Sequence, residues 1–187
     1  MGKINIGPNG FIYPMPMTLV GTMIAGRPNF MAAAWVTRIN ASPPLAAVAI
    51  GRSHATGEGI KTQGSFSINF PGIDLIRETD YCGLVSGKRV DKSQIFEVFY
   101  GELKTAPLVT ACPLCFECRL VDTVELPTND LFIGQIVAAY AEEECLTDGS
   151  PDIQKMKPFV LTMPDNRYWA VGESLGRAWH DGRKFRA

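Results

Sequence analysis

Histidine is scarce in this sequence, and long apolar runs are missing. The 187 residues include only His54 and His180, far apart in the chain, so a hydrolytic triad built on a histidine base is not indicated. The apolar stretch at residues 17–26 contains two glycines and is too short to span a bilayer. The first ten residues hold one lysine with no apolar segment behind it, which does not match a secretory signal.

An excess of charge of either sign is also missing. The formal net charge is −1, from 18 basic and 19 acidic residues, which favours neither a nucleic-acid partner nor an anionic membrane. The five cysteines are not spaced like a secreted disulfide scaffold, and we expect a cytoplasmic protein. No repeat or linker interrupts residues 1–187, and we expect a single domain.

What the sequence does contain is a series of strand-like runs separated by turn residues. Its 18 glycines and 13 prolines are spread along the chain, which predicts a mainly β, antiparallel barrel with short inserted helices. We expect a hairpin turn at 27–29, a helix at 56–62, and a helix at 72–87 with Ile73, Ile76 and Tyr81 inward. The tail 168–183 is expected to lie over the sheet as a loop and short helix. Strands are expected at 16–26, 29–39, 44–51, 65–71, 115–126 and 131–145.

The stretch GRSHATGEGI, residues 51–60, places polar side chains where a strand gives way to a helix. The first amides of a helix lack internal partners, and the helix dipole makes this end positive. Arg52, Ser53, His54 and Thr56 could therefore hold a phosphate group. The alternative is that Thr56 is only an N-cap and Arg52 a solvated charge.

Alanine is unusually frequent in two predicted strands, MAAAWV and LAAVAI. Small side chains let another layer approach the backbone closely. That layer is either a flat aromatic ligand, bonded to backbone groups at a strand edge, or a packed helix or second subunit. Trp35, at the end of the first alanine run, lines such a site or belongs to the core.

Three cysteines, Cys112, Cys115 and Cys118, follow one another at spacings of three. This pattern is compatible with part of a metal or iron–sulfur ligand set, but a closed site needs a fourth ligand. Cys115 and Cys118 would also face opposite sides of a regular strand. Buried or partly exposed free thiols are the main expectation. A redox-active pair of Cys112 and Cys115 remains open.

Taken together and in order, several segments resemble the flavin reductase-like proteins with an FMN-binding split barrel, and most of all the flavoredoxins. The resemblance spans residues 13–176. It implies a Greek-key split β-barrel, a homodimer and one FMN per subunit. The segments are YPMPMTLVGT, GRPNFMAAAWVTRINASPP, RSHATGEGIKTQGSFSINFP, DYCGLVSGKRVDK, APLVTACPLCFECRLVDTVEL, LFIGQIV and YWAVGESLG.

Carried over residue by residue, the resemblance implies a cofactor site. Asn29 would contact the flavin ring or ribityl chain, and Lys92 would be a second phosphate contact, with Lys88 a weaker candidate. Tyr168 and Trp169 would close a pocket edge or pack in the core. The remaining implied residues are Ala33, Ala34, Trp35 and Val36 at the ring, and Arg52, Ser53, His54 and Thr56 at the phosphate.

The flavin would carry the redox chemistry, so no catalytic side chain is expected. Asn129 stands where many relatives carry a histidine associated with nicotinamide, and an amide cannot titrate like imidazole. The electron donor is therefore either NAD(P)H or another protein. The alternatives are a non-catalytic flavin-binding protein of the same fold, or a thiolate metal protein using the three cysteines.

Overall fold

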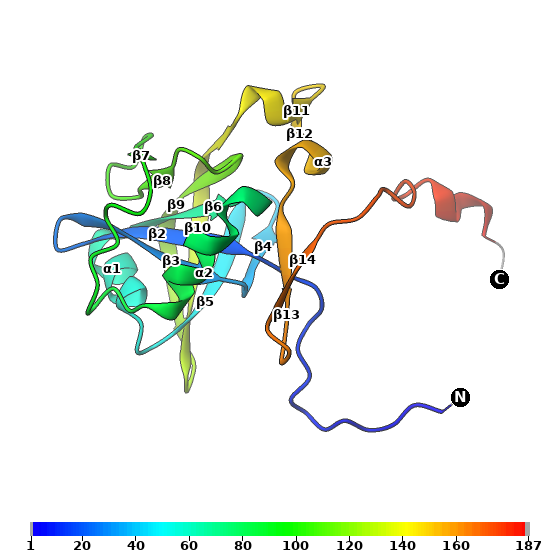
Figure 1. The fold of residues 1–187 in the computed structure, drawn as a ribbon, viewed down its shortest axis with the longest axis horizontal. Coiled ribbons are helices and arrows are strands. Elements are labelled where there is room, and N and C mark those ends of the chain that lie inside the picture. The colour runs from blue at the N-terminus through cyan, green and yellow to red at the C-terminus, as the bar shows by residue number, and fades with distance from the viewer. Residues whose placement is uncertain (1, 186–187) are drawn as a thin grey trace.

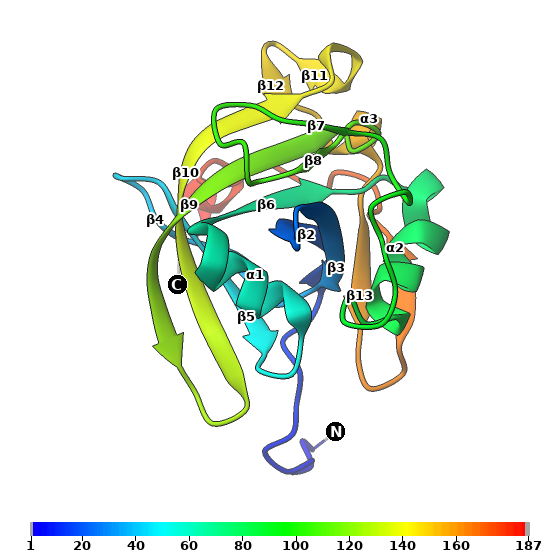
Figure 2. The ribbon, with the colours of Figure 1, turned by 90° about the vertical axis from the view of Figure 1, so that its left-hand side faces the viewer.

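A computed structural model describes residues 2–185 and shows a mainly β protein (Figure 1). Seven strands form one antiparallel sheet in the order β3-β2-β6-β9-β10-β5-β4, which curls into a barrel (Figure 2). This confirms the expected antiparallel barrel, in the crossed strand order of a Greek key. The strands are β2 (Thr18–Ile24), β3 (Arg27–Ala33), β4 (Val36–Asn40), β5 (Leu45–Gly51), β6 (Ser65–Phe70), β9 (Leu114–Glu125) and β10 (Asn129–Ala141).

The barrel is split between β3 and β4. These strands follow one another in the chain, yet they stand at the two ends of the sheet and do not pair. The chain leaves β3 at Ala33 and enters β4 at Val36, so the expected single strand 29–39 is divided in two. Both strands therefore present backbone donors and acceptors at unpaired edges.

The turn between β2 and β3 differs from the expected one at 27–29. Ile24 pairs with Arg27, so the turn consists of Ala25 and Gly26, with φ of 49° and 75°. Two positive φ values match the twist of a tight hairpin, and glycine adopts them without strain. Pro28 then lies within β3, where the edge position tolerates its missing N–H.

Two apolar clusters form the core. The first fills the barrel and includes Val48, Phe66 and Phe132. The second lies between β2–β3 and the segment that follows helix α2 (Ile76–Leu84), and includes Phe30 and Leu108. The barrel interior is thus filled by apolar side chains, and the first cluster extends to Ala33 at the split.

Of the three α-helices in the described residues, α1 and α2 pack against the barrel, and α3 lies near β11, β12 and β13 (Figure 1). Helix α1 (Ala55–Gln63) lies across one opening, and α2 (Ile76–Leu84) lies outside β3 (Figure 2). α3 (Ile153–Met156) is a single turn capped by Asp152, whose carboxylate accepts the Gln154 N–H. Within residues 2–185, no helix is both long enough and apolar enough to cross a bilayer.

The orientation of α2 corrects part of the sequence prediction. Ile73 lies in the 3₁₀ turn η1 (Ile73–Leu75) and is 38% exposed, and Tyr81 is 43% exposed. The buried residues of α2 are Thr79 and Cys82, which lie three apart on one face. Ile73 and Tyr81 therefore point outward, and the face that carries Thr79 and Cys82 packs inward.

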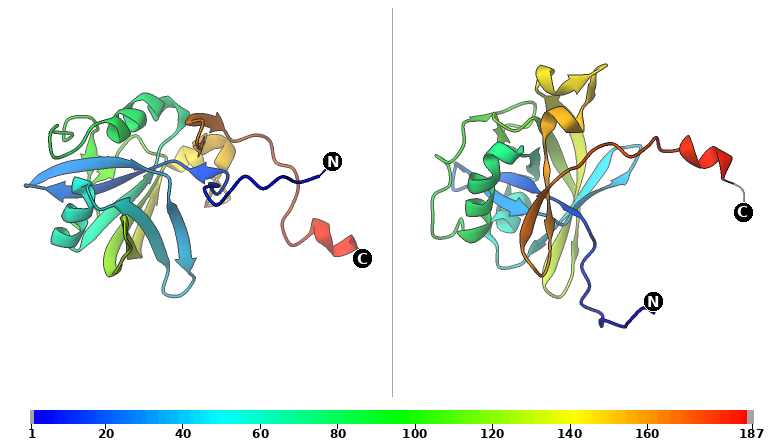
Figure 3. Two further views of the ribbon diagram at one scale, coloured as in Figure 1. Left: turned by 90° about the horizontal axis from the view of Figure 1, so that it is seen from below. Right: turned by 45° about the vertical axis from the view of Figure 1, so that its right-hand side comes forward.

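A smaller sheet, β1-β13-β14, lies beside the barrel. Beyond it the tail leaves the molecule instead of covering the sheet, contrary to expectation, and ends on the same side as the N-terminal segment (Figure 3). Leu175 and Trp179 are almost fully exposed there. The remaining elements are β1 (Met15–Pro16), β7 (Val98–Phe99), β8 (Leu108–Val109), η2 (Glu143–Cys145), β11 (Leu146–Thr147), β12 (Ser150–Pro151), β13 (Phe159–Thr162), β14 (Arg167–Ala170) and η3 (Asp181–Lys184).

A fully buried carboxylate, Glu117 on β9, fixes the long segment after α2. Its oxygens accept the backbone N–H groups of Gly101, Glu102 and Leu103 at 2.9–3.2 Å. They also accept the hydroxyl of Tyr140 at 3.1 Å. These four hydrogen bonds compensate the Glu117 carboxylate for its burial, which would otherwise be very costly. They also hold residues 101–103 against β9.

Candidate functional site

A small pocket lies where α1, β3 and the segment after α2 meet. His54, Thr56, Ser86 and Lys92 contribute to its lining, together with Met31 of β3. α1 starts after His54, which is extended and offers no side-chain cap. The first amides of α1 are therefore free to bind an anion.

Thr56 is not the cap of this helix, as the sequence suggested, but a buried residue of its first turn. Its Oγ1 accepts a hydrogen bond from Asn29 Nδ2 at 3.0 Å. Because the hydroxyl accepts from Asn29, its own proton remains free to donate to a ligand. Asn29 thus orients Thr56 from the neighbouring strand.

Lys92 is the most unusual charge in the pocket. It is only 3% exposed, and Nζ donates to the carbonyl oxygens of Phe30 at 2.9 Å and Cys82 at 2.8 Å. Burial lowers the pKa of Lys92. No ion pair joins it to a carboxylate within the described residues. An ammonium buried without a counter-charge favours an anionic ligand.

Gly87 and Ser86 complete the pocket, and the sequence analysis did not assign them. Asn29 Oδ1 lies so close to Gly87 that a Cβ there would overlap it. Glycine is thus required for the loop to approach β3. The signal was present in the sequence as a Ser-Gly pair between α2 and Lys92, but a turn glycine and a contact glycine look alike.

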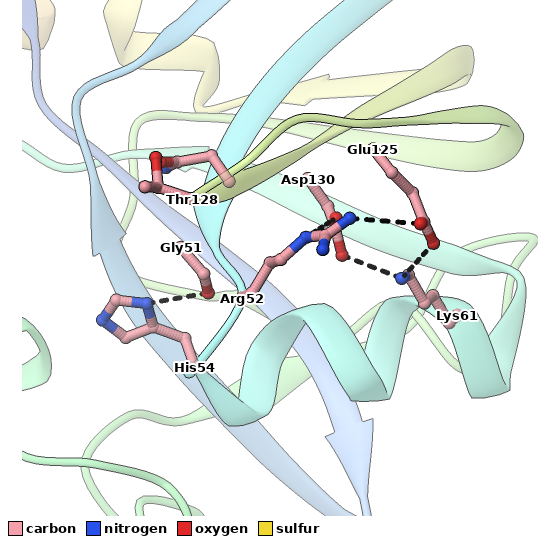
Figure 4. Close-up of polar contacts among 8 residues, drawn as sticks. Gly51, Arg52, His54, Lys61, Glu125, Thr128 and Asp130 are labelled. Atoms are coloured by element: carbon pink, nitrogen blue, oxygen red, sulfur yellow. Dashed lines mark hydrogen bonds and ion pairs between the residues drawn. The ribbon is translucent and has the colours of Figure 1, made fainter.

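Arg52 does not line this pocket, and its contact with a phosphate stays a prediction. Its guanidinium donates to Asp130 at 3.0 Å and to Glu125 at 3.1 Å (Figure 4). Lys61 of α1 binds the same two carboxylates, at 2.8 Å to Asp130 and 3.6 Å to Glu125. The four charges tie α1 to the β9–β10 hairpin. The hydrogen bond from Lys61, followed by that from Arg52, lowers the pKa of Asp130.

The Asp130 cluster predicts a defined pH dependence of stability. A carboxyl group whose pKa is lower in the folded protein than its ordinary value of 3.8 stabilises the fold at pH values above 3.8. This stabilisation is lost as the pH falls through the folded pKa. In Asp130→Asn the contribution is absent at every pH. We expect the Tm of this variant to lie below wild type at pH 6, and the gap to narrow as the pH falls below about 4.

Thermal unfolding from pH 6 to pH 3 measures this gap. Asp122→Asn, an exposed carboxylate on the adjacent strand, is the matched control and should follow wild type throughout. A Tm difference between Asp130→Asn and wild type that does not change with pH would contradict the stabilising role assigned to the Asp130 carboxylate.

His54 and Ser53 lie at the exposed edge of the same corner. The imidazole Nδ1 of His54 is 3.0 Å from the carbonyl oxygen of Gly51 (Figure 4), so the ring is held beside the start of α1. Lys88, the weaker candidate, forms an ion pair with Glu58 at 2.7 Å. Asn129 pairs with Gly51 and lies next to the turn of the β9–β10 hairpin.

A second, larger cavity of about 830 Å³ lies on the other side of the split. Ala34, Trp35 and Val36 form part of its wall, and Ala33 is buried behind them, its carbonyl accepting the hydroxyl of Thr18 at 2.7 Å. Trp35 is 49% exposed, so it is a wall residue rather than a core residue. The alanine run therefore connects the small pocket to this groove. Ala47 and Ala49, from the second alanine-rich run, also line this groove. The other lining residues, which the sequence analysis did not assign to a site, are Asn9, Gly10, Phe11, Ile12, Pro14, Met15, Pro16, Thr37 and Leu131.

Tyr168 and Trp169 do not line either cavity. Tyr168 packs on Phe159 with 5.3 Å between ring centres and donates its hydroxyl to Asp80 at 2.7 Å. Burial, followed by this hydrogen bond, raises the pKa of Tyr168 to about 12. The packing alternative is the one that the geometry supports for Tyr168, and it fastens β14 to α2.

The three spaced cysteines do not gather into one cluster. Cys112 and Cys115 belong to the second core cluster, whereas Cys118 faces the barrel interior. Burial raises the pKa of Cys118 to about 12. A hydrogen bond with Cys115, followed by burial, raises that of Cys112. The described residues contain no group of three or more His, Cys, Asp or Glu side chains arranged to hold a metal ion. Thiols that resist ionisation are poor ligands and poor nucleophiles.

The fold and the split place this chain among flavoproteins built on the split barrel. Residues 11–164 match the family model of the flavin reductase like domain, and the chain belongs to that family. It is similar to the flavoredoxin of Methanosarcina acetivorans, with 56% identity, 98% of each chain covered and a TM-score of 0.96.

Two further solved structures are also similar. The flavoredoxin of Desulfovibrio vulgaris (Miyazaki F) is 36% identical, with 97% of this chain and 100% of that chain covered and a TM-score of 0.91. An FMN-binding protein from Thermus thermophilus with bound 1-cyclohex-2-enone is 28% identical, with 95% and 99% coverage and a TM-score of 0.79. The expected resemblance to flavoredoxins is confirmed.

Proposed function

We propose that this protein is an FMN-binding oxidoreductase of the flavoredoxin type, which passes electrons through bound flavin. The observation that carries the proposal is Lys92, a buried ammonium that forms no ion pair with a carboxylate among residues 2–185. A phosphate group supplies the missing negative charge. The split opens into an uncharged groove that suits an aromatic ring.

The phosphate is held by the side chains of Lys92 and Thr56 and by the first amides of α1, with Ser86, Ser53 and His54 at its edge. Asn29 orients Thr56 toward the phosphate through its hydrogen bond to Oγ1, and its implied contact with the flavin ring or ribityl chain stays part of the proposal. Arg52 is not part of the proposed phosphate site, because its guanidinium already binds the carboxylates of Glu125 and Asp130.

The flavin ring is held along the split by Ala33, Ala34, Trp35 and Val36. Because alanine side chains are small, a flat ring can approach the backbone of the two unpaired strand edges closely. Backbone N–H groups aimed at the ring stabilise negative charge on it. Bound FMN supplies one- and two-electron chemistry, and the protein supplies position and exclusion of water.

The remaining parts of the proposal concern the electron donor, the oligomeric state and the location of the protein. The electron donor is either NAD(P)H or a reduced partner protein, and Asn129 in place of a histidine supports the latter. We further propose one domain over residues 1–187, a cytoplasmic homodimer, and no nucleic-acid or membrane partner.

A visible absorbance spectrum of the purified protein tests the cofactor. We expect a yellow protein that releases one FMN per chain on denaturation. Anaerobic addition of NADH, NADPH and then dithionite separates the donors. Bleaching by the nucleotides identifies a reductase, and bleaching only by dithionite points to a protein donor. A colourless protein that cannot be reconstituted with FMN would overturn the proposal.

A further inference from the structure

The pocket lined by Thr56 and Lys92 is too narrow to admit a phosphate group without a change of shape. Its volume is about 20 Å³, whereas a cavity needs about 10–15 Å³ to hold a single water molecule. A phosphate group is several times larger than water, so at least one wall of the pocket must move to admit it. The walls are the start of α1, Met31 of β3, the end of α2, and residues 85–87 with Lys92.

Three of these walls are fixed in the fold. Helix α1 is anchored before its start by Arg52 and in its last turn by Lys61, and both bind Asp130, which is 6% exposed. Strand β3 pairs with β2 along its whole length. At the end of α2, Cys82 is buried in the second core cluster. The wall that remains is the segment that follows α2.

Residues 86–91, which we call the strap, have the features of a movable segment. They form no helix or strand, and no residue of the strap belongs to either core cluster. The strap is a turn, in which the N–H groups of Arg89 and Val90 donate to the carbonyl oxygen of Ser86 at 2.9 and 3.0 Å. Helix α2 holds it at one end and the buried Lys92 at the other. Segments with few buried contacts open at a small cost in free energy, so the strap is the wall that moves.

Two ion pairs fasten the strap, one to each of its neighbours. Lys88 Nζ lies 2.7 Å from Glu58 of α1, and Asp91 pairs with Arg27 at the start of β3. The four side chains are 45–67% exposed. Exposed ion pairs contribute little individually and are screened by salt. The strap is therefore held against two fixed elements by contacts that break readily.

We propose that the strap opens to let the phosphate group of FMN enter and leave the pocket, and that these two ion pairs keep it closed between those events. The inference rests on the proposed function, because it concerns exchange of the cofactor assigned to this pocket. Opening breaks the contacts of Lys88 with Glu58 and of Asp91 with Arg27, while Lys92 stays in place. Because the strap is closed before association and again after it, the ion pairs slow both rates by the same factor. The affinity for FMN then depends little on them.

The double variant Lys88→Met/Asp91→Asn tests this proposal. It breaks both ion pairs but removes one charge of each sign, so the long-range attraction of anionic FMN is kept. Asparagine also retains the oxygen that accepts the Ser93 N–H. We expect the rate constants of FMN association and release both to rise by about three- to tenfold, with the dissociation constant within about twofold of wild type. Stopped-flow flavin fluorescence measures association, and rapid dilution of the FMN-loaded protein measures release.

Two controls separate opening of the strap from a general loosening of the protein. Arg167→Gln removes an equally exposed ion pair, with Asp165 beside β14, and its FMN rates should match those of wild type. Riboflavin has no phosphate group to pass the strap, so its rates should be the same in wild type and in the double variant. Riboflavin rates that rise as much as the FMN rates would refute the inference.

The remaining outcomes distinguish failure of this inference from failure of the proposed function. Wild-type protein that binds no FMN contradicts the proposed function and removes the basis of the inference. Protein that binds FMN with the same rates in wild type and double variant contradicts the inference alone. Faster release with unchanged association would show that the ion pairs stabilise only the FMN-bound form, and this result also overturns the role of the strap as a gate.

Discussion

Lys92→Met is expected to weaken FMN binding by about 10- to 100-fold, because a charge-assisted hydrogen bond contributes about 1.5–3 kcal/mol. Methionine keeps most of the side-chain volume but removes the ammonium that binds the carbonyl oxygens of Phe30 and Cys82. Fluorescence titration of the flavin-free protein measures the dissociation constant. Riboflavin, which lacks the phosphate, should bind wild type and variant with the same affinity.

This comparison separates a phosphate contact from a general loss of structure. A disturbed pocket would weaken FMN and riboflavin alike, and that result would contradict the assignment of Lys92. Lys88→Met is the matched control, because Lys88 already forms an ion pair with Glu58. We expect its FMN affinity to stay within about twofold of wild type, since exposed ion pairs contribute little.

Glu117→Ala is expected to lower the free energy of unfolding by about 3 kcal/mol or more, because each buried donor left unpaired costs about 1–3 kcal/mol. The substitution removes the acceptor of three backbone N–H groups and of the Tyr140 hydroxyl. Glu117→Gln should be destabilising as well, since its NH₂ group would face donors. Urea unfolding followed by tryptophan fluorescence measures both variants.

Glu102→Ala is the control for this prediction. Its side chain is exposed, and its backbone N–H still reaches Glu117, so we expect a change within about 0.5 kcal/mol. If Glu117→Ala were as stable as Glu102→Ala, the loop would be held by its apolar contacts and not by the carboxylate.

The barrel could be predicted from the sequence because its strands carry local signals. Runs such as 44–51 and 65–71 end at glycine or proline, and they agree with β5 and β6 to within one residue. The break between β3 and β4 carries no such signal, because MAAAWVTRI is continuous strand-forming sequence. Only the barrel geometry decides where the chain must cross the split. The sequence also does not predict that the tail projects from the molecule, because its aromatic residues are of the types found in protein cores.

The candidate site was predicted in part. Thr56 and Lys92 line one pocket; the expected helix start suggested a phosphate at Thr56, and the resemblance implied Lys92. The partner of Arg52 could not be foreseen, because Asp130 lies 78 residues away in the sequence and meets it only through the pairing of β5 with β10. Asn29 was placed near the flavin by resemblance, whereas its contact with Thr56 depends on how α1 lies against β3.

The projecting tail has a consequence for handling the protein. Residues 171–180 form no regular helix or strand, and Arg177 and Arg183 lie in its exposed part, which leaves them open to trypsin. Barrel strands resist cleavage because their backbone is paired. Brief trypsin treatment should therefore shorten the chain at its C-terminal end and leave the barrel as one fragment in a mass spectrum. A tail covered by a second subunit would slow that cut, so the rate of digestion reports on assembly.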